Sequence, residues 1–102
     1  NEAINRLEIS AEEIPVSFEL YQNYPNPFNP TTKIKFALPQ NGRTKLTIYN
    51  TLGESVVELI NKELEAGYHE VEWNATSFSS GVYFYEIINN STKAYKKMIL
   101  VK

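Results

Sequence analysis

Hydrophobic and polar residues alternate along much of this chain. In residues 31–38 the apolar side chains of Ile34 and Phe36 fall on one face, and lysines fall on the other. Residues 43–50 show the same alternation. A period of two places one face of a β-strand in a core and the other face in solvent. Both segments are therefore predicted to be strands with one buried face.

Several other short runs rich in β-branched and aromatic residues are also predicted to be strands. The four glycines of the chain fall between these runs, where glycine supplies the positive φ angles of turns. Short strands separated by frequent turns are typical of an antiparallel β-sandwich, here of about seven strands. The further predicted strands are 18–21, 55–60, 65–74, 79–88 and 92–102.

Two of these runs carry more specific expectations. Residues 79–88 are apolar on both faces, which predicts a central strand covered on both sides. Gly81 lies at the start of that run, and we expect a Cβ there to clash. Tyr83 is expected to bury its ring and bond its hydroxyl. His69 alternates with Val71 and Trp73 and is interpreted as a packing or edge residue.

The first 17 residues differ from the rest. Ile4, Leu7 and Ile14 form only a thin apolar stripe, and Pro15 ends it. We interpret residues 1–17 as a linker from an upstream domain, with a short helix or an extra edge strand as alternatives. Residues 18–102 form the predicted sandwich domain.

Composition narrows the classes of function. A chain of 102 residues supports one domain, and a net charge of -2 lacks the basic excess that nucleic-acid binding requires. No cysteine is present, so disulfides and thiolate metal sites are excluded. No apolar run reaches the roughly 18 residues of a membrane span, so stable membrane insertion is not expected.

The sequence lacks the usual groupings of catalytic residues. His69 is the single histidine, and all twelve acidic residues are glutamate, which disfavours a metal-binding cluster or a calcium loop. No nucleophile motif or glycine-rich phosphate loop is found. We expect no catalytic, cofactor or metal site, and therefore no enzyme.

The segment QNYPNPFNPTT, residues 22–32, combines three prolines with three asparagines. Proline lacks a backbone donor, fixes φ and pushes the preceding residue towards an extended geometry. The segment is therefore predicted to be a rigid, non-pairing path at one end of the sandwich. Asn23, Asn26 and Asn29 are expected to cap exposed backbone, and Phe28 to plug the end of the core.

Several motifs in series carry a resemblance to a known family. They are PNPFNPTT in residues 25–32, IYNTLG in residues 48–53, GVY in residues 81–83 and the closing KKMILVK. Together, over residues 18–102, the chain resembles the type A C-terminal sorting domain of the type IX secretion system, found in Bacteroidetes and related phyla.

The resemblance implies an immunoglobulin-like antiparallel β-sandwich that is a non-catalytic sorting signal. Its implied partners are the type IX translocon, a sortase-like protease that removes the domain in many members, and an upstream cargo domain in the same chain. The cargo would cross the periplasm and reach the cell surface or the medium. The recognition residues that it implies, with the closing strand as the expected recognised surface, are Pro25, Asn26, Pro27, Gly81, Tyr83, Lys96, Lys97 and Lys102.

Residue periodicity adds a constraint and leaves alternatives. Lys96 and Lys97 are expected on opposite faces of the last strand, whose edge is suited to strand addition by a partner. An extracellular adhesion or carbohydrate-binding sandwich has the same expected fold. So does a structural assembly module similar to the immunoglobulin-like part of the flagellar hook-capping protein.

Overall fold

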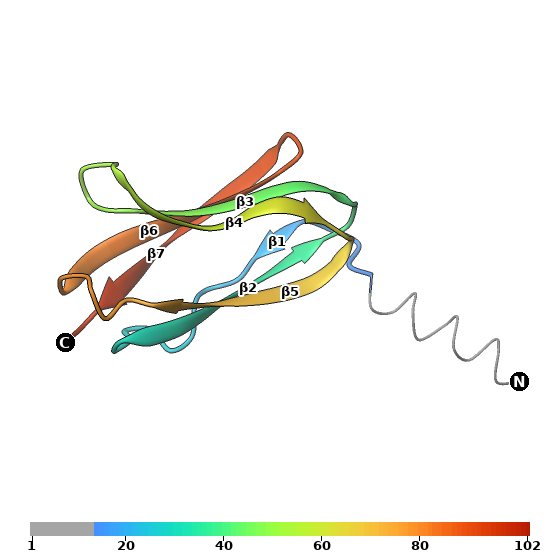
Figure 1. Ribbon diagram of the computed structural model, residues 1–102. Coiled ribbons are helices and arrows are strands. Elements are labelled where there is room, and N and C mark those ends of the chain that lie inside the picture. Colours follow the sequence, from blue (N-terminus) through green and yellow to red (C-terminus); the bar gives the residue numbers. More distant parts are fainter. Residues whose placement is uncertain (1–13) are drawn as a thin grey trace, which may run out of the picture.

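The computed structural model describes residues 14–102, which contain seven β-strands and no helix (Figure 1). The strands follow the apolar and polar runs of the sequence, most clearly in β2, where Thr32, Ile34 and Phe36 are buried and the two lysines between them are exposed. Their bounds are β1 Glu19–Leu20, β2 Thr31–Leu38, β3 Gly42–Tyr49, β4 Ser55–Leu64, β5 Gly67–Asn74, β6 Gly81–Asn89 and β7 Thr92–Leu100.

The strands form two sheets that face each other. One sheet has the order β1-β2-β5, the other has the order β4-β3-β6-β7, and all neighbouring strands are antiparallel. The predicted all-β sandwich of about seven strands is confirmed. In this arrangement β7, the last strand, is an edge strand of the four-stranded sheet.

The predicted strand positions agree with the structure, apart from their lengths. Thr31–Leu38 is a strand as expected, but the strand predicted over residues 55–60 continues to Leu64, which lies opposite Gly42. Residues 14–17 form no strand, and Val16 is 99% exposed. Residues 1–13 of the predicted linker lie outside the described residues, so the linker remains a prediction.

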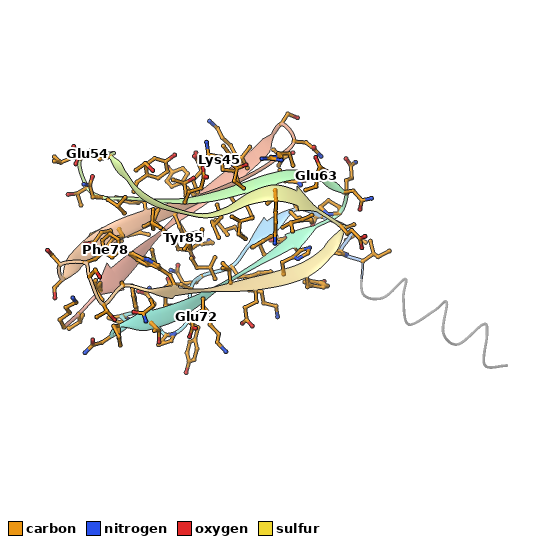
Figure 2. The ribbon with its side chains drawn as sticks, in the orientation of Figure 1. Lys45, Glu54, Glu63, Glu72, Phe78 and Tyr85 are labelled. Atoms are coloured by element: carbon orange, nitrogen blue, oxygen red, sulfur yellow. The ribbon has the colours of Figure 1, made fainter. Side chains whose placement is uncertain are left out.

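The core lies between the two sheets and is built from alternate residues of both. Ile34 and Phe36 of β2 face Leu46 and Ile48 of β3, and all four are fully buried. Glu63 and Glu72 lie on the outside, whereas Tyr85 lies between the sheets (Figure 2). Burial of this apolar surface is the main stabilising contribution.

The prediction that residues 79–88 are covered on both sides is wrong. In β6 the inner side chains, such as Tyr83 and Ile87, are buried, but the outer ones, such as Phe84 and Ile88, are only half-buried. The outer face of β6 is apolar, yet no second layer of described residues packs over it.

The hydroxyl of Tyr85 makes two hydrogen bonds between the four-stranded sheet and the loop that follows β1. Tyr85 of β6 donates to the carbonyl of Tyr21 at 2.7 Å and accepts from the backbone N–H of Asn23 at 2.8 Å. Asn23 is itself buried and donates through Nδ2 to Thr32 Oγ1. Burial raises the pKa of Tyr85 to about 12, partly offset by the hydrogen bond from Asn23.

Tyr85 is expected to make the fold sensitive to alkali. The pKa of Tyr85 is about 12 in the folded state and about 10 in the unfolded state. The protonated hydroxyl therefore makes its full contribution to the free energy of unfolding below pH 10. As the pH rises from 10 towards 12, this contribution is lost and the free energy of unfolding falls by roughly 2 kcal/mol. Tyr85→Phe should lower the free energy of unfolding by about 1–3 kcal/mol at pH 7.

Denaturant unfolding of both proteins between pH 7 and 12 tests this. The gap between the native chain and Tyr85→Phe should narrow above pH 10. A gap that stays constant to pH 12 contradicts the assignment.

Candidate recognition surface

The PNPF segment lies against the end of the last strand. The backbone N–H of Phe28 donates to the carbonyl of Ile99 at 3.0 Å, and the N–H of Val101 donates to the carbonyl of Phe28 at 2.9 Å. Asn26 Oδ1 accepts from the N–H of Ile99 at 3.0 Å. The segment therefore forms an isolated parallel bridge with β7 at Phe28.

This pairing corrects one expectation. The proline-rich segment is not a non-pairing path, because Phe28 pairs with β7 and Tyr24 pairs with Lys33 of β2. The prolines lack donors, but the residues between them keep theirs. The loop and the closing strand, which are far apart in the sequence, therefore lie side by side.

The loop restricts strand addition at the edge of β7. Beyond the contacts at Ile99 and Val101, Gln22 Nε2 donates to the carbonyl of Lys97 at 2.7 Å. Among residues 14–102, no hydrogen bond reaches this edge before Lys97. A partner strand therefore finds open backbone groups along the first half of β7 only.

Asparagine side chains hold the loop in part as expected. Asn23 Nδ2 donates to the carbonyl of Pro25 at 3.1 Å, and Thr32 Oγ1 donates to the same carbonyl at 2.8 Å. Asn26 caps Ile99, but Asn29 makes no side-chain hydrogen bond with the described residues. Three exposed residues, Pro25, Asn26 and Pro27, form the outer surface of this loop.

Gly81 begins β6 directly opposite Leu100 of β7. The expected clash is wrong, because an added Cβ would meet no atom within 4 Å. The requirement is instead conformational, since φ is +152°, a value that residues with a side chain rarely adopt.

Tyr83 is buried as expected, and its hydroxyl donates to the carbonyl of Ser79 at 2.7 Å. Its ring meets Trp73 edge-on, with 5.5 Å between the centroids. Trp73 also contacts Phe78 at 5.3 Å and Phe28 at 5.7 Å. Phe28 is 2% exposed, so it fills the end of the core as predicted.

The three predicted lysines occupy different positions. Lys96 is half-buried on the inner side of β7, opposite Tyr85, whereas Lys97 is exposed on the outer side, opposite Phe84. The opposite orientation is as expected. Lys102 follows the strand, and its backbone N–H donates to Ser80 Oγ at 3.0 Å while its ammonium donates to the carbonyl of Thr76.

These positions define one surface. Pro25–Pro27, Gly81 and Lys102 come from three separate parts of the chain and lie around the end of β7, and Lys97 precedes them on the same strand. We call these residues the signature surface. Tyr83 supports it from within the core, and Lys96 lies on the other side of β7.

The single histidine of the chain packs against an aromatic residue of the core. His69 stacks on Phe36 with 5.4 Å between ring centroids, and its Nε2 lies 2.8 Å from the carbonyl of Glu65. It lies on β5, an edge strand, in the packing position predicted for it. Within residues 14–102, no three histidine or acidic side chains converge as metal ligands. None of these residues forms a helix of the length and apolarity needed to cross a membrane.

Sequence reasoning missed one feature, a shallow hollow on the outer face of the four-stranded sheet. Tyr49, Phe84, Glu86 and Tyr95 line it together with the turn at 50–53. The signal was present in the apolar residues on the second face of β6, but it was interpreted as a sign of complete burial.

Comparison with known proteins agrees with the motif series. The profile of the secretion system C-terminal sorting domain family matches residues 22–102. This match spans most of the chain, so the protein belongs to that family. It is a sorting-signal domain of type IX secretion, which implies export to the cell surface or the medium. A search of curated protein sequences finds no match.

Two solved structures of Porphyromonas gingivalis share the fold. PorZ, a surface component of the type IX secretion system, is 21% identical with a TM-score of 0.57, over 81% of this chain and 11% of PorZ. Dimeric latent PorU is 19% identical with a TM-score of 0.64, over 85% of this chain and 9% of PorU. The chain thus spans about a tenth of either protein.

The contribution of the Phe28 ring to the stability of the fold can be measured by substitution. Phe28→Ala removes a buried ring next to Trp73 and should lower the free energy of unfolding by about 3 kcal/mol or more. Tyr24→Ala is a matched control, because Tyr24 lies in the same loop with its side chain 80% exposed. The control should lose less than about 0.5 kcal/mol. Equal losses for the two variants would refute the core-filling role.

Proposed function

We propose that the type IX translocon recognises the signature surface and so selects the protein for export. The observation that supports this is the direct hydrogen bonding between Asn26 and Phe28 of the loop and Ile99 of the closing strand. The loop motif and the closing strand are distant in sequence, yet they lie in direct contact. A receptor that reads both needs only one contact area.

The charges on this surface suit recognition. Lys97 and Lys102 are exposed, and no carboxylate lies within ion-pair distance of either among the described residues. In contrast, Lys45 on the same sheet pairs with Glu58 at 3.9 Å. Unpaired positive charges attract an acidic partner and accelerate association.

The direction of the chain leaves this surface accessible. Residue 14 lies at one end of the sandwich, and Lys102 lies at the other (Figure 1). We infer that a cargo domain preceding residue 14 would extend away from the signature surface. The cargo would then cross the periplasm with its signal exposed, and a sortase-like protease would cleave between cargo and domain after passage.

Export can be tested with a reporter. The 102-residue chain is fused to the C-terminus of a fluorescent protein that carries a periplasmic leader, in a host with an intact type IX system. Fluorescence should appear on the surface or in the medium, and it should stay in the periplasm when the translocon gene is deleted. The reporter without the domain is the control. Retention in the intact host would contradict sorting by this domain.

Point variants test the surface itself. Deleting β7 would also remove the buried Met98 and Leu100, so unfolding would obscure the result. Lys97→Gln combined with Lys102→Gln should instead lower export at least five-fold and change the free energy of unfolding by less than about 0.5 kcal/mol.

The matched control is Lys33→Gln combined with Lys35→Gln, which removes two exposed lysines from β2 in the other sheet. Export of this control should remain at the native level. If both pairs of substitutions reduce export equally, the translocon responds to net charge rather than to the signature surface.

A further inference from the structure

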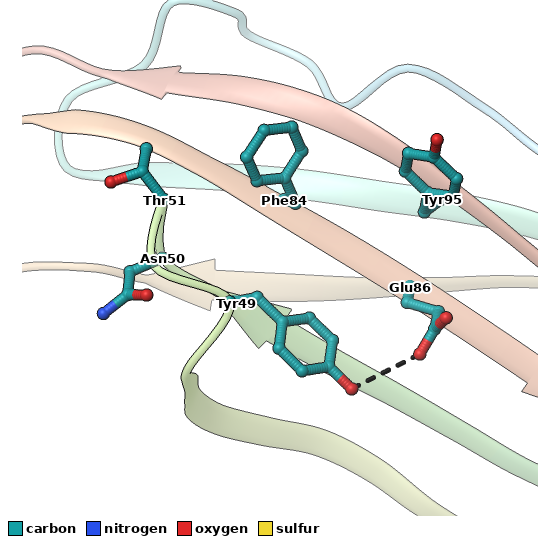
Figure 3. Close-up of a pocket in the computed structure, with 7 residues that line it drawn as sticks. Tyr49, Asn50, Thr51, Phe84, Glu86 and Tyr95 are labelled. Carbon is teal, nitrogen blue, oxygen red and sulfur yellow. Dashed lines mark hydrogen bonds between the residues drawn. The ribbon is translucent and has the colours of Figure 1, made fainter.

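The outer face of the four-stranded sheet carries a hollow of about 310 Å³. Tyr49 of β3, Phe84 of β6 and Tyr95 of β7 surround it, and Glu86 lies between the rings of Tyr49 and Tyr95 (Figure 3). The signature surface contributes no residue to its lining. This volume lies at the lower limit of the range for ligand pockets and is large enough for a single side chain.

The pairing of the strands fixes this arrangement. Tyr49 lies directly opposite Phe84, and Glu86 lies between Thr47 and Tyr95 in one row across the sheet. The Tyr49 hydroxyl donates to Glu86 Oε1 at 3.3 Å. Burial, and then the charge of Glu86, raise the pKa of Tyr49, so this donor keeps its proton at neutral pH.

The turn after β3 forms a rigid wall of the hollow. Asn50 Oδ1 accepts from the N–H of Leu52 at 2.9 Å and from that of Glu54 at 3.0 Å. Asn50 Nδ2 also donates to the Glu54 carboxylate at 2.8 Å. A wall that is already ordered loses little entropy when a ligand binds.

The charge of the hollow favours a cation. Among its lining residues, Glu86 is the one acidic side chain, and none is a lysine, arginine or histidine. Aromatic faces attract ammonium and guanidinium groups, and a carboxylate beside them strengthens that attraction. In contrast to the interior of the hollow, its rim along β7 is positive, because Lys93 and Lys97 flank Tyr95 on the outer face of that strand.

The edge of β7 offers the means to present such a cation. Lys97 and Ile99 direct backbone groups away from β6 towards the loop, so by the two-residue period Tyr95 and Lys93 direct theirs to the same edge. No hydrogen bond from residues 14–102 occupies that part of the edge. A strand added there would place a side chain next to Tyr95, about 5 Å away.

We propose that the first half of β7 binds a strand of a partner protein. On the outer face of that strand, every second residue carries a charge, in the order acidic, basic, acidic. The basic side chain crosses Tyr95 and enters the hollow towards Glu86. The acidic side chains lie opposite Lys93 and Lys97, as cross-strand ion pairs do. The inference concerns binding by the isolated domain and does not depend on its export.

The test is a titration of the 102-residue chain, isotopically labelled for NMR, with a designed peptide at low salt. The peptide is acetyl-Thr-Glu-Val-Arg-Val-Glu-Thr-amide, and its control replaces arginine by citrulline, which keeps the shape and removes the charge. The arginine peptide should bind at least five-fold more tightly and shift the amides of Lys93, Tyr95 and Glu86.

Variants of the protein sharpen the result. Glu86→Gln should abolish the preference for arginine over citrulline, and the matched control Glu58→Gln, a neighbouring carboxylate paired with Lys45, should retain it. A peptide with inverted charges, acetyl-Thr-Arg-Val-Glu-Val-Arg-Thr-amide, should bind more weakly than the first.

Two outcomes would overturn the proposal. One is the absence of a preference for the arginine peptide, because the protein binds both peptides with equal affinity or binds neither. The other is binding of an oligosaccharide such as cellohexaose, with shifts at Tyr49 and Phe84 and no response to either peptide, which would identify a sugar site.

Discussion

The pairing of Phe28 with the end of β7 is the contact on which the signature surface depends. Its backbone bonds to Ile99 and Val101, while its ring fills the core beside Trp73. Earlier in the same loop, Tyr24 pairs with Lys33 of the opposite sheet. One loop thus ties the two sheets together, so the exposed residues between those two contacts are held in a defined position.

The prolines make this position specific. Pro25, Pro27 and Pro30 have no N–H, so few backbone donors remain in the loop, and those of Tyr24 and Phe28 are the ones that pair with strands β2 and β7. Fixed φ angles also reduce the entropy that the loop loses on folding. The stiffness of the segment is therefore compatible with pairing and limits it to one register.

Local patterns predicted the strands, whereas contacts between distant residues could not be predicted. The alternation in residues 31–38 was sufficient, because one face of β2 is buried and the other is solvated. The bond between Asn26 and Ile99 spans 73 residues and follows from the sheet order, which periodicity does not specify. The prediction that the outer face of β6 is covered was wrong for another reason. An apolar face indicates that a contact forms there, but it does not show which residues or which partner make that contact.

The lysines of β7 determine which strands its open edge accepts. If two copies paired antiparallel about Tyr95, Lys93 of one copy would lie opposite Lys97 of the other, twice over. Like charges directly opposite each other destabilise a sheet, so the edge disfavours self-association. The same two charges attract a strand with acidic residues at those positions, while Glu86 favours a base between them. The edge is therefore selective by charge: it repels its own copy and remains open to a complementary partner.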